Sequence, residues 1–137
     1  MSTTDWSGNV YLDLDVILAE LKEDDWLASE VELEAVESPK TSVATGIELQ
    51  YVMEDDWPRD RVVCAHREIT ESGIEMVPLE GDALDAAADL RSRYDSLNVF
   101  DGIHLWTAHV LGETIVSTDT LYPAISDVEH ADPRDLG

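Results

Sequence analysis

The chain has 137 residues, 44% of them hydrophobic, which is enough for one folded domain with its own core. Its 31 acidic residues outnumber the 8 Lys and Arg, and the formal net charge of −23 argues against binding nucleic acid through charge alone. The one cysteine, Cys64, excludes an internal disulfide and any multi-cysteine zinc site. No apolar run approaches the roughly 20 residues needed to span a bilayer, and MSTTDWSG lacks the pattern of a signal peptide. We therefore expect a soluble, cytoplasmic protein.

The hydrophobic pattern predicts strands and helices in alternation. We expect, in chain order, a strand at 9–14, helices at 15–23 and 25–37, a turn at 38–40, a strand at 41–44, helices at 45–55 and 58–71, a strand at 74–78, helices at 81–95 and 99–111, a strand at 113–118 and a short strand near 125–129. This alternation predicts an α/β fold with a central parallel sheet of four to five strands and helices on both faces. We expect one domain over residues 9–130, with tails at 1–8 and 131–137, the latter loose.

The acids are interleaved with periodic apolar residues, so a folded domain with a solvated acidic surface fits better than a disordered chain. Such a surface repels itself at low ionic strength and is screened in strong salt, where the Debye length is about 3 Å at 1 M. The composition resembles that of salt-adapted proteins of halophilic archaea. This resemblance suggests an environment and no function.

Several acids fall where predicted strands end. Asp13 and Asp15 interrupt the apolar run of the first strand, Glu48 follows the second strand, Asp101 begins a long helix, and Asp119 directly follows the strand TIVST. In a parallel sheet, ligands bind beyond the carboxyl ends of the strands. Four regions of the chain can therefore each supply a carboxylate to one edge of the sheet.

Carboxylates brought so close repel one another unless a cation neutralises them. Oxygen ligands without a cysteine or histidine motif suit Mg²⁺ or Mn²⁺, which in turn suit the hydrolysis of phosphate esters. The competing interpretation is that each acid belongs to the solvated surface, with Asp101 capping its helix and Asp119 in a turn. Asp13 is the exception, because an acid between VYL and VIL has no such explanation.

At this point the residues match a family. The chain resembles the PIN domain, the nuclease fold of VapC-type toxins and of several RNA-processing enzymes. YLDLDVIL has the form of the opening strand of that family, and the Glu of GIEL matches its second acid. The closing block DGIHLWTAHVLGETIVSTD follows the family pattern without a gap, at Asp101, Thr107, Ala108, Gly112, Ser117 and Asp119. The resemblance runs from Val10 to about Pro123 and implies a three-layer α/β/α fold.

The resemblance implies the roles of particular residues. The metal-binding, catalytic acids fall on Asp13, Glu48, Asp101 and Asp119, and Ser117 matches a hydroxyl that orders them. It further implies dependence on Mg²⁺ or Mn²⁺, RNA as substrate, a homodimer, and a small antitoxin as the partner of toxin members.

The chain departs from the family at three places. Asp15 is acidic where many members have Asn, Ser or Thr, and we expect it to cap the helix or to lie beside the metal ligands. His104 and Trp106 stand where small or aliphatic residues are commoner; His104 either contacts substrate or metal or is a packed helix residue. Tyr122 and Pro123 replace an Asp-Phe pair.

Two rival enzyme classes and one non-enzyme class remain. Haloacid-dehalogenase-type phosphatases and receiver domains also place acids after a first strand, but both need a late lysine and none follows Lys40. The other alternative is a catalytically weak PIN-fold module that acts in RNA processing or regulation through a protein partner. Any contact with RNA would depend on the metal and on local arginines, of which the candidates are Arg59, Arg61, Arg67, Arg91 and Arg93.

Overall fold

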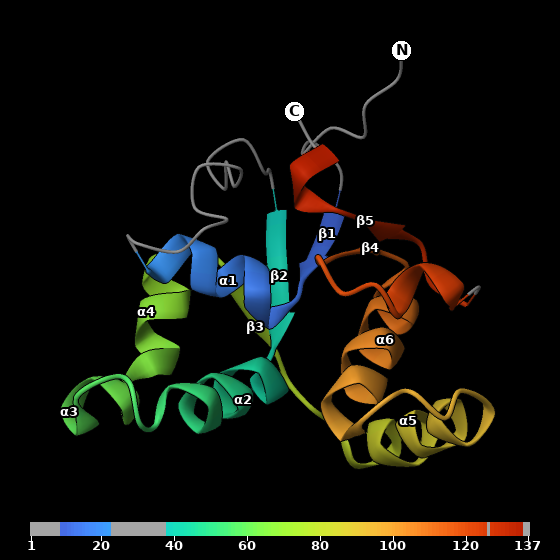
Figure 1. Ribbon diagram of the computed structural model, residues 1–137, viewed down its shortest axis with the longest axis horizontal. Coiled ribbons are helices and arrows are strands. Elements are labelled where there is room, and N and C mark those ends of the chain that lie inside the picture. Colours follow the sequence, from blue (N-terminus) through green and yellow to red (C-terminus); the bar gives the residue numbers. More distant parts are fainter. Residues whose placement is uncertain (1–8, 23–37, 126, 136–137) are drawn as a thin grey trace.

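A five-stranded, all-parallel sheet forms the centre of the molecule, with strands in the order β3-β2-β1-β4-β5 and helices on both sides (Figure 1). The computed structural model describes residues 9–22, 38–125 and 127–135. Its strands are β1 (Asn9–Leu12), β2 (Ser38–Ser42), β3 (Glu75–Val77), β4 (Thr114–Val116) and β5 (His130–Ala131). Its helices are α1 (Leu14–Leu21), α2 (Val43–Met53), α3 (Arg59–Val62), α4 (Ala65–Glu71), α5 (Gly81–Arg93) and α6 (Val99–Leu111). The predicted three-layer α/β/α fold is confirmed.

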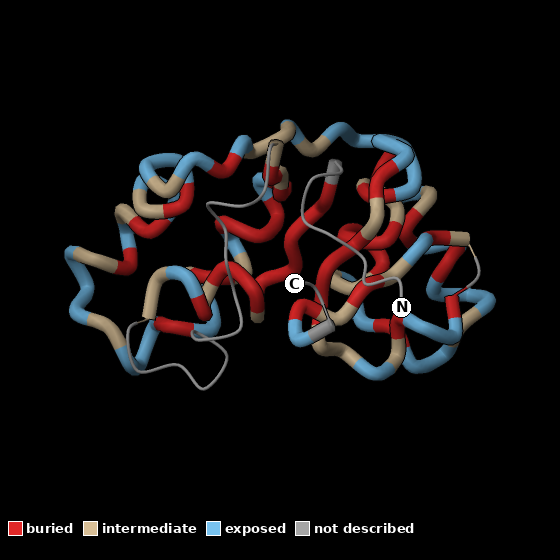
Figure 2. The backbone as a smooth tube through the Cα atoms, turned by 90° about the horizontal axis from the view of Figure 1, so that it is seen from above, coloured by how far each residue is buried: buried red, intermediate tan, exposed pale blue. Residues whose placement is uncertain are grey.

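The central strand β1 divides the core into two layers because its side chains alternate between the faces of the sheet. Val10 and Leu12 pack on one face with residues of α1, α2 and α4. Tyr11 packs on the other face with Leu90 of α5 and Leu105 of α6. Figure 2 shows buried backbone concentrated in the middle of the molecule, with exposed segments around it. The carboxyl end of β1 therefore lies among helices of both layers.

The helix α6 begins and ends as the sequence predicts. Asn98 caps its first turn by accepting a hydrogen bond from the backbone of Asp101, whose side chain accepts one from the Asn98 backbone. Gly112 ends the helix at φ 67°, a left-handed conformation that costs glycine little. Local signals at both ends of α6 agree, so its boundaries follow from sequence alone.

The predicted turn at 38–40 is wrong, because these residues begin β2. Pro39 lies beside Val10 in the parallel register with β1, but pairing with β3 starts one residue later, at Lys40. A proline at the start of a strand, before the second neighbour joins, removes little of the hydrogen-bond ladder. The turn propensity of SPK is therefore overridden by tertiary pairing.

Other boundaries also differ from the prediction. The helix expected at 58–71 is broken at Val63 and Cys64 into α3 and α4. The last strand lies at 130–131 rather than near 125–129, and a 3-10 helix covers Pro133–Asp135, so residues 131–135 are not the loose tail that we expect. The helix predicted at 25–37 lies outside the described residues.

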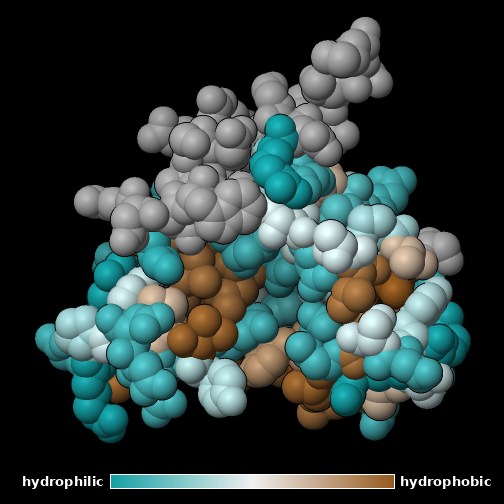
Figure 3. Space-filling model, in the orientation of Figure 1, coloured by the Kyte–Doolittle hydropathy of each residue, from teal (hydrophilic) through white to brown (hydrophobic). Residues whose placement is uncertain are grey.

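The face of the molecule in Figure 3 is mostly hydrophilic, with separate apolar patches between the polar groups. None of the described helices is both long enough and apolar enough to cross a membrane.

Candidate metal centre

Asp13 occupies the junction between β1 and α1, at the carboxyl edge of the sheet. Its backbone N–H still donates to Val116 of β4, and its carboxylate accepts hydrogen bonds from the backbone N–H of Leu14 at 2.9 Å and from Ser117 Oγ at 2.8 Å. Only 8% of the residue is exposed. Burial raises the pKa of the Asp13 carboxyl above its ordinary value of 3.8, although His104 and the two hydrogen bonds oppose the rise. The carboxylate is therefore placed where its charge needs a cation.

Helices α2 and α6 bring two further side chains to Asp13. The Nε2 atom of His104 lies 2.8 Å from Glu48 Oε1 and 3.7 Å from Asp13 Oδ1. One possible ligand atom from each of these three residues lies within 4.8 Å of the other two. His104 is 1% exposed, so its contacts are with protein rather than water. These residues come from three separate elements, and they meet because α2 packs against α6 beyond the end of β1.

The ring of His104 is fixed from its other side. Its Nδ1 lies 2.7 Å from the hydroxyl oxygen of Tyr11, and that hydroxyl donates its hydrogen to Ser42 Oγ at 2.8 Å. The Tyr11 oxygen is thus available to accept a hydrogen bond from Nδ1–H. Burial alone would lower the pKa of His104, but Tyr11 and the carboxylates of Glu48 and Asp13 raise it well above 6.5. An imidazolium partly offsets the negative charge of the two acids when no metal is bound.

Asp15 faces Thr118 instead of joining this group. Its carboxylate accepts hydrogen bonds from the backbone N–H of Thr118 at 2.7 Å, from the Thr118 hydroxyl, and from Val16 at 2.9 Å. Burial and the nearby charge of Asp13 raise the pKa of the Asp15 carboxyl. Asp13, and not Asp15, caps α1, so the capping role expected for Asp15 is wrong. Asp15 ties the start of α1 to the loop after β4.

Asp101 and Asp119 lie near the same edge of the sheet, each held by its own contacts. Asp101 accepts a hydrogen bond from the Tyr122 hydroxyl at 3.1 Å. Asp119 accepts one from the backbone N–H of Leu121 at 2.9 Å, and its own N–H donates to Ser117 Oγ at 3.0 Å. Burial and the charges of Asp13, Asp101 and Asp119 raise the pKa of Tyr122, so its hydroxyl lies within the field of three acids.

The donor set fits a divalent cation. Within the described part of the chain, the compact group that can hold a metal comprises Asp13, Glu48 and His104, and it excludes Asp101 and Asp119. Ser117 nevertheless connects Asp13 with Asp119 through its hydroxyl. Carboxylate and imidazole are ordinary ligands of Mn²⁺ and related ions, and the buried Asp13 is a group whose charge a cation would stabilise.

The PIN domain family model matches residues 10–128. The chain belongs to the PIN domain family. No curated protein matches it significantly in sequence.

Solved structures share this PIN domain fold at low sequence identity. One is a DNA-bound VapBC from Salmonella typhimurium, with a TM-score of 0.73 and 15% identity over 91% of this chain and 98% of that chain. VapC20 from Mycobacterium tuberculosis, described as a toxin that cleaves the sarcin–ricin loop, gives a TM-score of 0.72 and 14% identity over 88% and 98%. A toxin–antitoxin complex from Klebsiella pneumoniae gives a TM-score of 0.68 and 15% identity over 90% of this chain and 97% of that chain. At these identities the likeness shows the fold alone.

Sequence reasoning missed three residues of the site. In the sequence, Tyr11 reads as one more apolar residue of the opening strand and Tyr122 as a departure from the family, yet both hydroxyls bond site residues. No pattern in the sequence marks Thr118 as the partner of Asp15. Alternation along β1 could have shown that Tyr11 faces the side opposite Val10 and Leu12. Nothing local could have identified His104 as its partner, 93 residues away.

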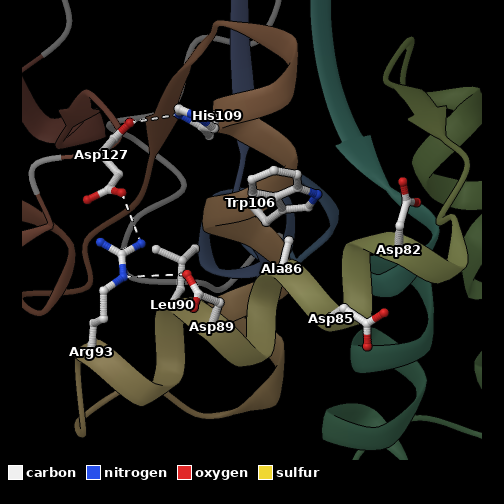
Figure 4. Close-up of a pocket in the computed structure, with 9 residues that line it drawn as sticks. All are labelled: Asp82, Asp85, Ala86, Asp89, Leu90, Arg93, Trp106, His109 and Asp127. Atoms are coloured by element: carbon white, nitrogen blue, oxygen red, sulfur yellow. Dashed lines mark hydrogen bonds and ion pairs between the residues drawn. The ribbon is translucent and has the colours of Figure 1, made fainter.

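Trp106 lies away from the acidic group, because it is two residues and about 200° around α6 from His104. It lines a groove between α5 and α6 with Ala86 and Leu90 (Figure 4). At one end of the groove Arg93 pairs with Asp89 and Asp127, and His109 bonds the Asp127 backbone. Trp106 therefore belongs to the contact between α5 and α6 rather than to the acidic group.

Two of the five candidate arginines are held by acids. Arg61 forms a bidentate pair with Glu68 and lies 3.5 Å over the ring of Trp57. Arg93 pairs with Asp89 and Asp127. These contacts reduce the charge that either residue presents to a polyanion.

Proposed function

We propose that this PIN domain is a metal-dependent endoribonuclease that hydrolyses RNA phosphodiester bonds. The observation that carries the proposal is the convergence of Asp13, Glu48 and His104 at the carboxyl edge of the sheet, within 4.8 Å of one another. Membership of the PIN domain family and the fold shared with a toxin that cleaves the sarcin–ricin loop support it.

The acids have distinct roles in this proposal. Asp13 and Glu48 bind Mg²⁺ or Mn²⁺ directly, and Asp101 and Asp119 complete the acidic edge and act in catalysis. The chemistry that a bound divalent cation supplies is activation of a water molecule and neutralisation of charge on the phosphate. Ser117 holds Asp13 by a 2.8 Å hydrogen bond and receives one from the Asp119 backbone, so it keeps these acids in place as substrate binds.

The partner in this proposal is a small antitoxin, and the chain acts in the cytoplasm as the toxin of the pair. Structures of VapBC from Salmonella typhimurium and of a toxin–antitoxin complex from Klebsiella pneumoniae share the fold, which supports this assignment. We also propose a homodimer. Light scattering of the chain alone, and of the chain co-expressed with the protein encoded beside it, tests both assemblies.

Cleavage of RNA tests the activity. We expect the wild-type chain to cut RNA in molar KCl with Mn²⁺, and to lose the activity in EDTA. Asp13→Asn and Asp101→Asn should each reduce cleavage by about 100-fold or more, because each removes a charge from the reacting centre. Asp55→Asn, at an exposed residue in the turn after α2, is the matched control and should cleave like wild type.

Equal residual cleavage in wild type and both site variants would refute the nuclease assignment. That outcome would favour the alternative, a weakly catalytic binding module. The compact group of Asp13, Glu48 and His104 supports the nuclease over the module, because a bound cation accounts for two carboxylates held so close together.

A further inference from the structure

His104 is the one nitrogen donor in a group otherwise made of carboxylates. It comes from the middle of α6, and its side chain is 1% exposed. Nε2 is the atom directed at the acids, at 2.8 Å from Glu48 and 3.7 Å from Asp13. A histidine that merely fills space in the core does not require two carboxylates beside the same ring nitrogen.

The hydrogen bond of the other ring nitrogen, Nδ1, explains why Nε2 is the nitrogen that can bind a metal. Nδ1 lies 2.7 Å from the Tyr11 oxygen, and the Tyr11 hydroxyl hydrogen points to Ser42. Nδ1 therefore keeps its hydrogen as a donor to Tyr11. Histidines that bind metals are held in the same way, by a hydrogen bond from the ring nitrogen remote from the metal.

We propose that His104 binds the divalent cation through Nε2, beside Asp13 and Glu48, and that this nitrogen makes the centre favour Mn²⁺ over Mg²⁺. The proposal rests on the proposed function, since it concerns the same centre. One ligand atom from each of the three residues already lies within 4.8 Å of the other two, so a small movement of the side chains would let them hold one cation together. The hydrogen on Nε2, which now faces Glu48, leaves as a proton to solvent when the metal binds.

The preference follows from ligand chemistry. Mg²⁺ takes oxygen ligands and keeps several waters, whereas imidazole binds the later first-row ions increasingly well. Mn²⁺ accepts both oxygen and nitrogen, so a site with one imidazole stabilises it more than Mg²⁺. A centre built only of the four predicted carboxylates would lack this discrimination.

Pulsed electron paramagnetic resonance of the Mn²⁺-loaded wild-type chain tests the ligand directly. We expect ¹⁴N modulation from one coordinated imidazole, which should disappear in His104→Gln. His109→Gln, which removes an exposed histidine of the same helix, is the matched control and should keep the signal. Bound Mn²⁺ without ¹⁴N modulation in the wild-type chain would overturn the proposal, whatever the variants do.

Metal affinity tests the preference, with Mn²⁺ measured by its free-ion signal and Mg²⁺ by competition. His104→Gln should weaken Mn²⁺ binding by about 10–100-fold and Mg²⁺ binding much less. Tyr11→Phe keeps the histidine but removes its anchor, so it should weaken Mn²⁺ binding by a smaller factor. Circular dichroism confirms that the variants are folded; should His104→Gln not fold, the wild-type ¹⁴N signal and Tyr11→Phe still decide.

The outcomes separate the two proposals. If His104→Gln weakens the binding of Mn²⁺ and Mg²⁺ equally, or makes either bind more tightly, the proposed role of His104 is overturned. The residue would then be a counter-ion that the metal displaces. Mn²⁺ bound through oxygen alone would leave the nuclease proposal standing. A wild-type chain that binds neither ion would overturn both.

Discussion

Replacing Asp13 by asparagine should stabilise the metal-free protein while it abolishes metal binding. Asp13 is 8% exposed, and the pKa of its carboxyl is raised chiefly by burial. A raised pKa means that the fold disfavours the charged form relative to the unfolded chain. Asparagine has nearly the same shape and retains an oxygen that can accept the hydrogen bond from the Leu14 backbone. It therefore removes the unfavourable charge and preserves the cap of α1.

The expected change in stability depends on two neighbouring charges, His104 and Glu48, that act on the Asp13 carboxylate in opposite directions. At an effective dielectric constant of about 20, attraction to His104 at 3.7 Å amounts to about 4.5 kcal/mol, and repulsion from Glu48, within 4.8 Å, to at least about 3.5 kcal/mol. Desolvation of the Asp13 carboxylate then decides whether its charge stabilises or destabilises the fold. An incompletely compensated buried group costs about 1–3 kcal/mol. We expect the free energy of unfolding to rise by about 1 kcal/mol, or the Tm by about 3–5 °C.

The pH dependence of stability follows from the raised pKa of Asp13. A group whose folded pKa is raised contributes its stability fully below its unfolded pKa, here 3.8, and loses it as pH rises through the folded pKa. The wild-type chain without metal should thus lose stability relative to Asp13→Asn as pH rises through the folded pKa of Asp13. Added metal should reverse the order, because a ligand at 100 times its Kd stabilises the wild type by about 2.7 kcal/mol.

Thermal unfolding in molar KCl, with EDTA or with saturating Mn²⁺, measures both effects. Asp55→Asn, which removes one exposed acid outside the site, controls for the general reduction of a −23 net charge. An Asp13→Asn protein less stable than wild type in EDTA would refute the reasoning, because the carboxylate would then be a net stabilising group. A variant that Mn²⁺ stabilises as much as wild type would remove Asp13 from the metal site.

Two further predictions concern the scaffold. Gly102→Ala should destabilise the protein by about 1–3 kcal/mol in urea unfolding, because a Cβ there would lie 3.1 Å from the Ala87 carbonyl oxygen where α5 packs on α6. Gly81→Ala is the control, because a Cβ at that position meets nothing within 4 Å. Lys40→Met should cost about 3 kcal/mol in the same assay, because it leaves the 7% exposed Glu113 without its cation. Adding Glu113→Leu should recover most of that loss, and no recovery would show that the ion pair is not the cause.

Local sequence signals were reliable where they act within one element. The boundaries of α6 agree with the prediction because its ends are determined locally: Gly112 stops the helix through its own backbone conformation, and the structure shows Asn98 capping its start. The turn predicted at 38–40 failed because β1 pairs with those residues, and that pairing joins parts of the chain far apart in sequence. The short β5 was misplaced because a two-residue strand has too little pattern to locate.

The sequence by itself determined that an acid stands at the end of the first strand. Asp13 follows an apolar run, and a parallel sheet carries the end of that run to the edge where ligands bind. Only the tertiary structure decided which side chains meet that acid. Glu48 and His104 are 56 residues apart, and their 2.8 Å contact depends on how α2 and α6 pack. The spacing of residues in the sequence predicts which of them share a face of one helix or strand. The angle and distance between two helices depend on the packing of the whole core.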